Sequence, residues 1–117
     1  MGQPQCDLVR GNLDLVLLSV LTKGPAYGYL LQQRLRETSG GMVDVQAGTL
    51  YPLLHRLEAE RLIRSRWDTA SRRRRKWYEL TATGRRTLVR QARQWHEQVE
   101  CLRRILAPIL RGAPEPA

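Results

Sequence analysis

The chain has too few cysteines and histidines for a structural zinc site. Its 117 residues include two cysteines, Cys6 and Cys101, and two histidines, His55 and His96. The cysteines lie far apart in sequence and do not show the spacing of metal ligands. We therefore expect no metal and no cofactor. The sparse use of cysteine also suits a reducing cytoplasm, where we place the protein.

Long apolar runs are missing as well. The run from Leu13 to Leu21 is about nine residues long and contains Asp14, whereas a membrane-spanning helix needs about 20 residues. No basic n-region precedes this run, which is a further argument against a signal peptide. We expect no membrane partner.

Groups for catalysis are equally scarce. Neither histidine has a nucleophile with which it forms a recognisable pair, and the sequence holds no glycine-rich phosphate loop. We expect that the protein is not an enzyme.

Positive charge, by contrast, is abundant and very unevenly distributed. The formal net charge is +9, yet residues 1–60 carry five Lys and Arg against six Asp and Glu. Residues 61–117 carry fifteen bases against five acids, and eight of these bases fall within 61–76. Charge gathered in this way predicts a polyanionic partner, and nucleic acid is favoured over an anionic membrane surface.

The first expected helix begins after Asn12, its predicted cap, and ends at Gly24, where glycine followed by proline is a usual stop signal. This helix is apolar nearly all round, so it should be buried on more than one side. In so small a domain, we expect the side that carries Leu15 and Leu18 to meet another chain. A second helix ends before Ser39 and contributes core residues only, namely Tyr27, Leu30, Leu31 and Leu35.

A third helix follows the short connection 42–46. Its expected buried stripe is Leu50, Leu53, Leu54 and Leu57. At 100° per residue the opposite face has no acid before Glu58. That face carries Gly48, Thr49, Tyr51, Pro52, His55 and Arg56.

A β-hairpin is expected next, with strands near residues 62–67 and 76–80 and a polar tip between them. The tip ends in an uninterrupted cationic run of Arg72, Arg73, Arg74, Arg75 and Lys76. Three short helices followed by a cationic hairpin are the parts of a winged helix-turn-helix. The predicted fold is therefore mainly α, of the α+β winged-helix kind.

The last helix, capped by Thr81, has the clearest periodicity in the chain. Its apolar positions alternate by four and three residues, which is a heptad seam that requires a partner helix. They are Leu88, Ala92, Trp95, Val99, Leu102, Leu106 and Ile109. Pro108 is expected to end or kink the helix near Ala107.

This gives a DNA-binding domain over residues 1–80, a dimerisation helix over 81–110, and a disordered tail over 111–117. Cys101 neighbours the seam. A free thiol is favoured there over a disulfide between two copies of the chain.

Three segments resemble the PadR family of bacterial transcriptional regulators. They are residues 21–29, 48–58 and 75–84, and the resemblance extends over about residues 10–107. The motif Gly48-Thr49-Leu50-Tyr51-Pro52 is the most specific part. The resemblance implies a homodimeric repressor with a two-stranded wing and, as in the short subgroup of the family, a single C-terminal dimerisation helix.

Each functional interpretation has an alternative. The outer face of the third helix is expected to enter the major groove of double-stranded DNA, although an ordinary amphipathic helix has the same pattern. Tyr51 has the further alternative of a core position. The cationic run is expected to bind phosphate or the minor groove rather than form a solvated loop. For Trp95, packing in the dimer interface is favoured over the platform for a small hydrophobic effector that some family members have.

The function expected from all this is sequence-specific repression at an inverted-repeat operator. A winged-helix protein that binds DNA without sequence choice, or binds RNA, is the first alternative. A protein–protein adaptor is the second.

Overall fold

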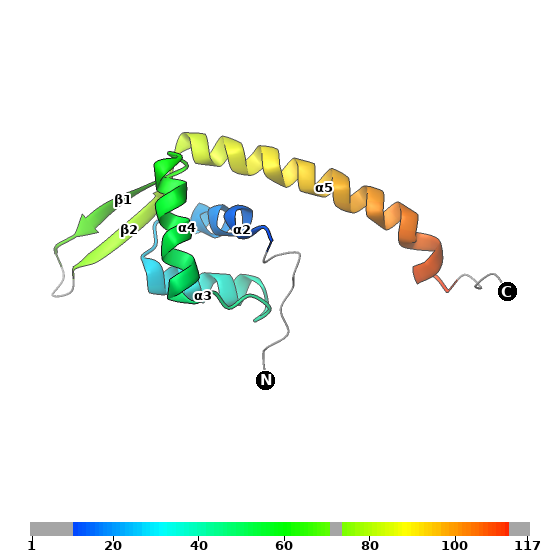
Figure 1. The fold of residues 1–117 in the computed structure, drawn as a ribbon, viewed down its shortest axis with the longest axis horizontal. Helices are drawn as coiled ribbons and strands as arrows, with labels where there is room; N and C mark the ends of the chain where they lie inside the picture. The colour runs from blue at the N-terminus through cyan, green and yellow to red at the C-terminus, as the bar shows by residue number, and fades with distance from the viewer. Residues whose placement is uncertain (1–10, 71–73, 113–117) are drawn as a thin grey trace.

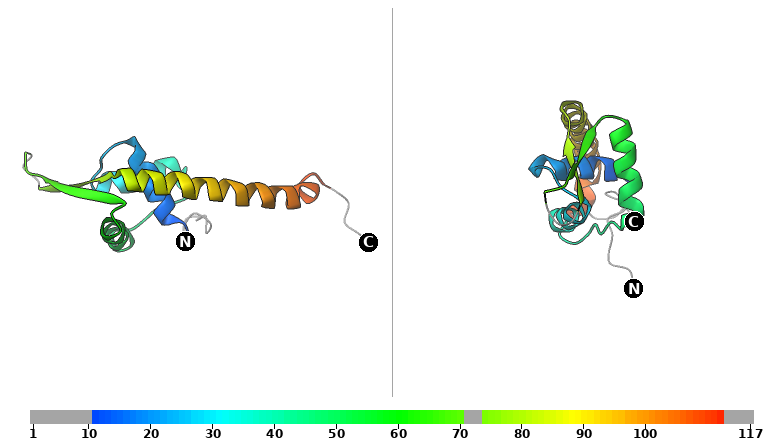
Figure 2. Two further views of the ribbon diagram at one scale, coloured as in Figure 1. Left: turned by 90° about the horizontal axis from the view of Figure 1, so that it is seen from above. Right: turned by 90° about the vertical axis from the view of Figure 1, so that its left-hand side faces the viewer.

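Four helices, a two-stranded sheet and a short 3-10 helix make up the described chain. The computed structural model describes residues 11–70 and 74–112. In chain order the elements are α2 (Leu13–Val20), η1 (Leu21–Lys23), α3 (Gly28–Thr38), α4 (Ala47–Ala59), β1 (Ile63–Asp68), β2 (Arg75–Leu80) and α5 (Ala82–Leu110). The helices α2, α3 and α4 cluster, while the hairpin and α5 project from the cluster in opposite directions (Figures 1 and 2). The predicted mainly helical winged helix-turn-helix is confirmed.

The core lies where the three short helices meet the base of the hairpin. The predicted stripe of α4 is confirmed, because Leu50, Leu54 and Leu57 are fully buried and Leu53 is half-buried. Leu18 is only 1% exposed and is packed by its own protomer. The expectation that Leu18 meets a second chain is therefore wrong, whereas Leu15 keeps part of its surface.

One helix start follows its sequence signal and another does not. Thr81 caps α5 as predicted, because its Oγ1 accepts a hydrogen bond from the N–H of Gly84 at 2.9 Å. Asn12 occupies the N-cap position of α2, but its side-chain oxygen does not bond the helix it precedes. It accepts instead from Nε1 of Trp95 on α5 at 3.0 Å. An asparagine that looked like a local cap thus connects two distant helices.

The hairpin is fastened to the helices at its base. Its strands pair antiparallel from Ile63 opposite Leu80 to Asp68 opposite Arg75. Ala26, just before α3, adds a bridge to β2: its N–H donates to the carbonyl of Tyr78 at 3.0 Å and its carbonyl accepts from the N–H of Tyr78 at 2.8 Å. This bridge anchors the base of the wing beside the start of α3.

The long helix α5 has 29 residues and changes its surroundings along its length. Its first half packs on α2, with Leu88 against the core, and its second half extends away from the body (Figure 1). In this single chain Leu102 is 55% exposed and Ile109 69% exposed. Large apolar side chains that are exposed together on one helix are typical of a protein-interaction surface.

Pro108 was expected to end or kink the helix near Ala107, and it does not end it. The helix continues to Leu110, and backbone hydrogen bonds close again after the proline, including Arg111 N–H to the carbonyl of Ala107 at 3.1 Å. Proline removes the bond that its own N–H would make and its ring crowds the carbonyl four residues earlier, which weakens a helix without always ending it. Of the predicted tail, residues 113–117 lie outside the described residues.

Candidate nucleic-acid interface

The outer face of α4 is open to solvent. All six residues predicted to lie on it are exposed, namely Gly48, Thr49, Tyr51, Pro52, His55 and Arg56. Nothing comes within 4 Å of the position that a Cβ at Gly48 would occupy, so another molecule can approach the backbone closely there. The outer face of α4 is therefore accessible for contact with the groove of a duplex.

Tyr51 is neither a core residue nor a free surface side chain. It is 42% exposed, and its ring lies against the backbone of Gly28 at the start of α3. A Cβ at Gly28 would stand 2.9 Å from Cζ of that ring. The absence of a side chain at Gly28 thus leaves the space that the ring of Tyr51 occupies.

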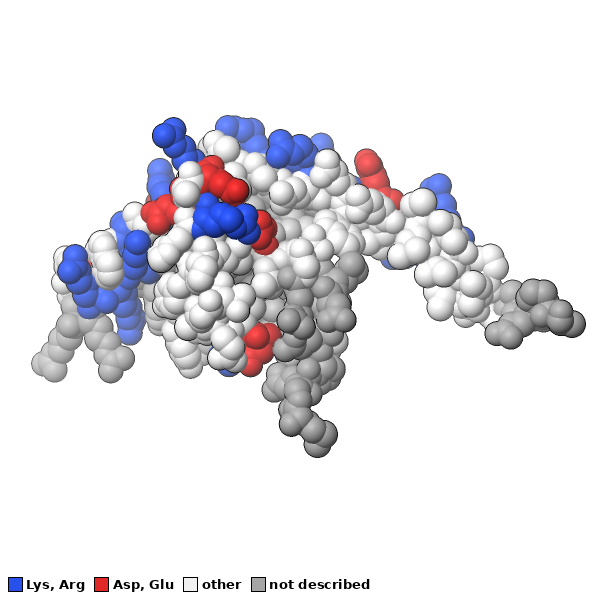
Figure 3. Space-filling view, in the orientation of Figure 1, with Lys and Arg blue, Asp and Glu red and all other residues white. Residues whose placement is uncertain are grey.

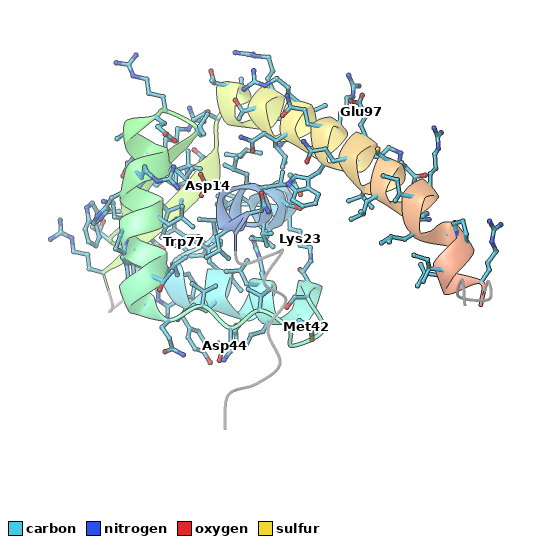
Figure 4. All side chains as sticks on the ribbon, turned by 45° about the vertical axis from the view of Figure 1, so that its right-hand side comes forward. Asp14, Lys23, Met42, Asp44, Trp77 and Glu97 are labelled. Carbon is cyan, nitrogen blue, oxygen red and sulfur yellow. The ribbon has the colours of Figure 1, made fainter. Side chains whose placement is uncertain are left out.

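Arg56 is less available than its position on α4 predicts. Its guanidinium forms ion pairs with Asp14 on α2 at 2.6 Å and with Glu60 at 3.6 Å. The hydrogen bond that Arg56 donates to Asp14, and the charge of that carboxylate, raise the pKa of Arg56. Figure 4 shows Asp14 on the side of α2 that faces α4. Arg56 is therefore directed toward α2, at the end of the face farthest from Gly48.

The described cations of the run 72–76 each lie near an aromatic ring. The guanidinium of Arg74 is 4.5 Å from the ring centre of Trp67, and that of Arg75 is 4.5 Å from the ring centre of Tyr27. The ammonium of Lys76 is 5.8 Å from the ring of Trp67. Arg72 and Arg73 lie outside the described residues. The blue surface of the wing in Figure 3 shows how these cations gather at one end of the molecule.

A groove of about 490 Å³ joins the helix face to the wing. It is lined by Tyr27, Gly28, Tyr29, Tyr51, His55, Trp67, Arg74, Arg75, Lys76 and Tyr78. The groove brings together residues from both expected sites, the outer face of α4 and the cationic run. An aromatic wall with a cationic rim fits a sugar–phosphate backbone, because rings pack on sugars while cations bind phosphate oxygens.

Sequence reasoning missed part of this groove. Tyr27 was expected in the core, yet it is half-buried and its ring meets Trp77 edge-on at 5.0 Å and 76°. Trp67 was given no role beyond a strand position. The available signal was the three cations followed directly by two aromatics over residues 74–78, since cations and stacking rings are combined in surfaces that bind nucleic-acid strands.

Glu58 on α4 is paired with groups of the hairpin. Its carboxylate accepts a hydrogen bond from the hydroxyl of Ser65 and lies 3.9 Å from the ammonium of Lys76. Burial, and then the charge of Glu58, raise the pKa of Tyr78 above its ordinary value. Glu58 is thus engaged within the protein, and its charge opposes a polyanion less than a free carboxylate would.

A second hollow, of about 380 Å³, lies between α2 and α5 beside Trp95. Its lining is rich in side-chain amides and comprises Gly11, Asn12, Asp14, Leu15, Gln91, Gln94, Trp95 and Gln98. Along the predicted seam, Leu88, Trp95 and Val99 are half-buried, whereas Ala92, Leu102 and Leu106 are exposed. Cys101 is exposed with a free thiol.

Two negative findings apply to residues 11–70 and 74–112. Within these ranges, no three His, Cys, Asp or Glu side chains gather closely enough to hold a metal ion. None of the helices described there has the length and apolar character needed to cross a bilayer.

The chain matches the model of the transcriptional regulator PadR-like family over residues 17–90. It is similar to the solved structure of a PadR family transcriptional regulator from Eggerthella lenta, with 38% identity, a TM-score of 0.76 and coverage of 86% of each chain. A PadR-like transcription factor from Bacteroides fragilis has 33% identity and a TM-score of 0.71, covering 85% of this chain and 94% of the other. An uncharacterised protein of Lysinibacillus sphaericus is 28% identical over 82% of this chain and 89% of its own.

Proposed function

The chain belongs to the PadR-like family of transcriptional regulators, and from this premise we propose that it is a homodimeric repressor of an inverted-repeat operator. Members of this family regulate transcription through DNA and are not enzymes. Each α4 would enter a major groove, and the two half-sites would lie about one helical turn apart on one side of the duplex.

One observation carries the proposal: the groove that the outer face of α4 shares with the cations of the wing. A duplex that meets Tyr51 and His55 on α4 also meets Arg74 and Arg75 on the wing. The single groove supports a role for both surfaces in binding the same molecule.

The two surfaces differ in what they can contribute. The α4 face offers Thr49, Tyr51 and His55, which can distinguish base edges but bring little charge. The wing brings several cations, which bind phosphates of any sequence. We therefore assign sequence choice to α4 and most of the affinity to the wing. Arg56 contributes to DNA binding only if it leaves Asp14.

The experiment that tests this is selection of bound fragments from genomic DNA by the purified full chain. A shared inverted repeat among the selected fragments, and much tighter binding to it than to mixed-sequence duplex at the same salt concentration, is the expected result. Equal affinity for all duplexes, or preference for RNA, would replace the repressor with a nonspecific nucleic-acid-binding protein. No binding to any duplex at physiological salt would favour a protein–protein adaptor.

The dimer is proposed from the seam of α5. Its residues Leu102 and Leu106 would pack against a second copy, together with Leu88, Ala92, Trp95 and Val99 from the same seam and Leu15 from α2. Leu102→Glu should give monomers in analytical ultracentrifugation and weaken operator binding. Arg104→Glu, about 200° around the same helix from Leu102, is the matched control and should leave the dimer intact.

Release by an effector is proposed at the hollow beside Trp95. The amides and Asp14 in its lining favour a flat compound that is aromatic or cationic over a purely aliphatic one. Such a compound should quench tryptophan emission and release the operator, and Trp95→Ala should abolish both effects. If quenching persists in Trp95→Ala, the signal comes from Trp67 or Trp77 and Trp95 has only a packing role.

A further inference from the structure

The two faces of the hairpin have different surroundings. Residues paired across an antiparallel hairpin share a face, so Ser65 lies with Tyr78 and Trp67 lies with Lys76. Alternation along each strand puts both pairs on one face. Ser65 and Lys76 both reach Glu58 on α4. This face is therefore turned toward α4, the proposed recognition helix.

Trp67 is the aromatic residue at the outer end of that face. It is 51% exposed, although a large apolar ring on a hairpin usually finds more cover. Its ring is approached by the guanidinium of Arg74 at 4.5 Å and the ammonium of Lys76 at 5.8 Å. The indole thus has two of the three described cations of the predicted run within about 6 Å of its centre, and Lys76 lies between it and the ring of Tyr78, which is 5.7 Å away.

A flexible cation binds phosphate weakly if it must first give up its rotamer freedom. A ring that already holds the cation reduces this loss, because part of the ordering is complete in the free protein. The face that Trp67 shares with Lys76 is the one that approaches α4, so the ordered cations are held beside the recognition helix.

We propose that Trp67 is a positioning residue, which holds Arg74 and Lys76 on the α4 side of the wing before DNA binds. This deepens the proposed function and rests on it, since the molecule bound by these cations is the phosphate backbone of duplex DNA. Trp67 acts through Arg74 and Lys76, and direct contact with DNA is not required of it.

The first measurement needs no DNA. Protons of the Arg74 side chain lie over the indole ring, so their NMR resonances in the free full-length protein should be shifted upfield. In Trp67→Leu, which keeps an apolar side chain without a ring, the same resonances should return to ordinary positions. Unshifted resonances in the wild type would overturn the proposal, whatever the protein binds.

The second measurement is binding of a labelled mixed-sequence duplex at one salt concentration. Each exposed cation–ring contact corresponds to about two- to fivefold in an equilibrium. Trp67→Leu should therefore weaken binding about five- to tenfold, and Trp67→Phe, which keeps a ring, should retain most of the affinity. Thermal melting checks that the variants fold. Equal weakening by Phe and Leu would contradict the proposal.

A double-mutant cycle separates positioning from direct contact. In the background Arg74→Gln with Lys76→Gln, Trp67→Leu should cost nothing further, since no cation remains for the ring to hold. If Trp67→Leu costs as much there as in the wild type, Trp67 contacts DNA itself or shapes the hairpin, and the proposal fails. Absence of binding by the wild type would instead refute the proposed function and leave the NMR result to decide on Trp67.

Discussion

Tyr51 on α4 and Gly28 on α3 fit together so closely that the ring of one occupies the space where the other would carry a side chain. They belong to separate sequence motifs, Tyr27-Gly28-Tyr29 and Gly48-Thr49-Leu50-Tyr51-Pro52. The contact therefore links the two helices of the helix-turn-helix at the surface proposed to meet DNA. It also gives a physical reason for glycine at position 28.

Gly28→Ala should weaken DNA binding about tenfold while changing the free energy of unfolding by less than about 1 kcal/mol. The added methyl displaces the Tyr51 ring, which is half exposed and can swing into solvent. Equilibrium binding and denaturant unfolding measure the two effects. In a Tyr51→Ala background the same substitution should no longer alter binding. A large loss of stability would show instead that α3 itself is disturbed.

Gly84→Ala should be far more damaging to stability. The added Cβ would overlap the carbonyl oxygen of Leu62 and stand 2.9 Å from its carbon. These are backbone atoms and cannot move aside without shifting the α4–β1 connection. We expect a loss of about 3 kcal/mol or more in urea unfolding. Thr83→Ala at the exposed neighbouring position should cost less than about 1 kcal/mol, and a similar cost for both would contradict the packing argument.

Neutralising the wing should reduce affinity for all duplex sequences alike. Arg74→Gln, Arg75→Gln and Lys76→Gln together should flatten the plot of log K against log salt by about 0.9 for each phosphate contact removed. Arg104→Gln on the distant half of α5 removes a charge without touching the wing and should leave the slope unchanged. An unaltered slope in the triple variant would exclude these three residues from phosphate binding.

Arg61→Gly should stabilise the protein by about 0.5–1 kcal/mol. Arg61 follows α4 with φ of 63°, a left-handed conformation that side chains disfavour and glycine adopts easily. Thermal unfolding measures the gain. Arg61→Ala, which keeps the Cβ, should give no comparable stabilisation. If Arg61→Ala stabilised the protein as much as Arg61→Gly does, the gain would come from the lost charge.

Tyr78 should make the fold sensitive to alkali. Burial raises its pKa above the ordinary 10.0, so the folded protein holds the phenol proton more tightly than the unfolded chain does. The resulting stability is fully present below pH 10 and decreases as the pH rises from there through the higher pKa of the folded state. Urea unfolding across this range should lose this dependence in Tyr78→Phe. An unchanged pH profile would show that Tyr78 ionises without destabilising the fold.

Much of the fold was predictable because its signals are local. The stripe of Leu50, Leu54 and Leu57 follows helical periodicity, and Thr81 precedes its helix with a hydroxyl at the right place. The order of three helices, a hairpin and a long helix then follows from these signals. Of the two outcomes expected at Pro108, an end or a kink, the helix end does not occur, because one missing hydrogen bond near a helix terminus costs little when the next bonds form again.

The errors at the candidate site concern partners that are distant in sequence. Asn12 binds Trp95, Arg56 binds Asp14, and Tyr27 meets Arg75. No periodicity along one segment contains such information. The predicted contact of Leu18 with a second chain was wrong for the same reason. Its apolarity correctly predicted burial, but it could not tell whether the covering atoms belong to the same chain or to another.

Thr81 has a mechanical consequence. Its hydroxyl is close to the carbonyls of Arg61 and Leu62, at 2.8 and 3.0 Å, and also receives the N–H of Gly84. The connection after α4 and the beginning of α5 therefore share one joint, while Trp95 ties the middle of α5 to Asn12 at the start of α2. Over the roughly 43 Å of α5, displacing its exposed end by about 4 Å corresponds to a tilt of only about 5° at the joint. Because α2 is packed against the first half of α5, such a tilt moves α2 together with α5.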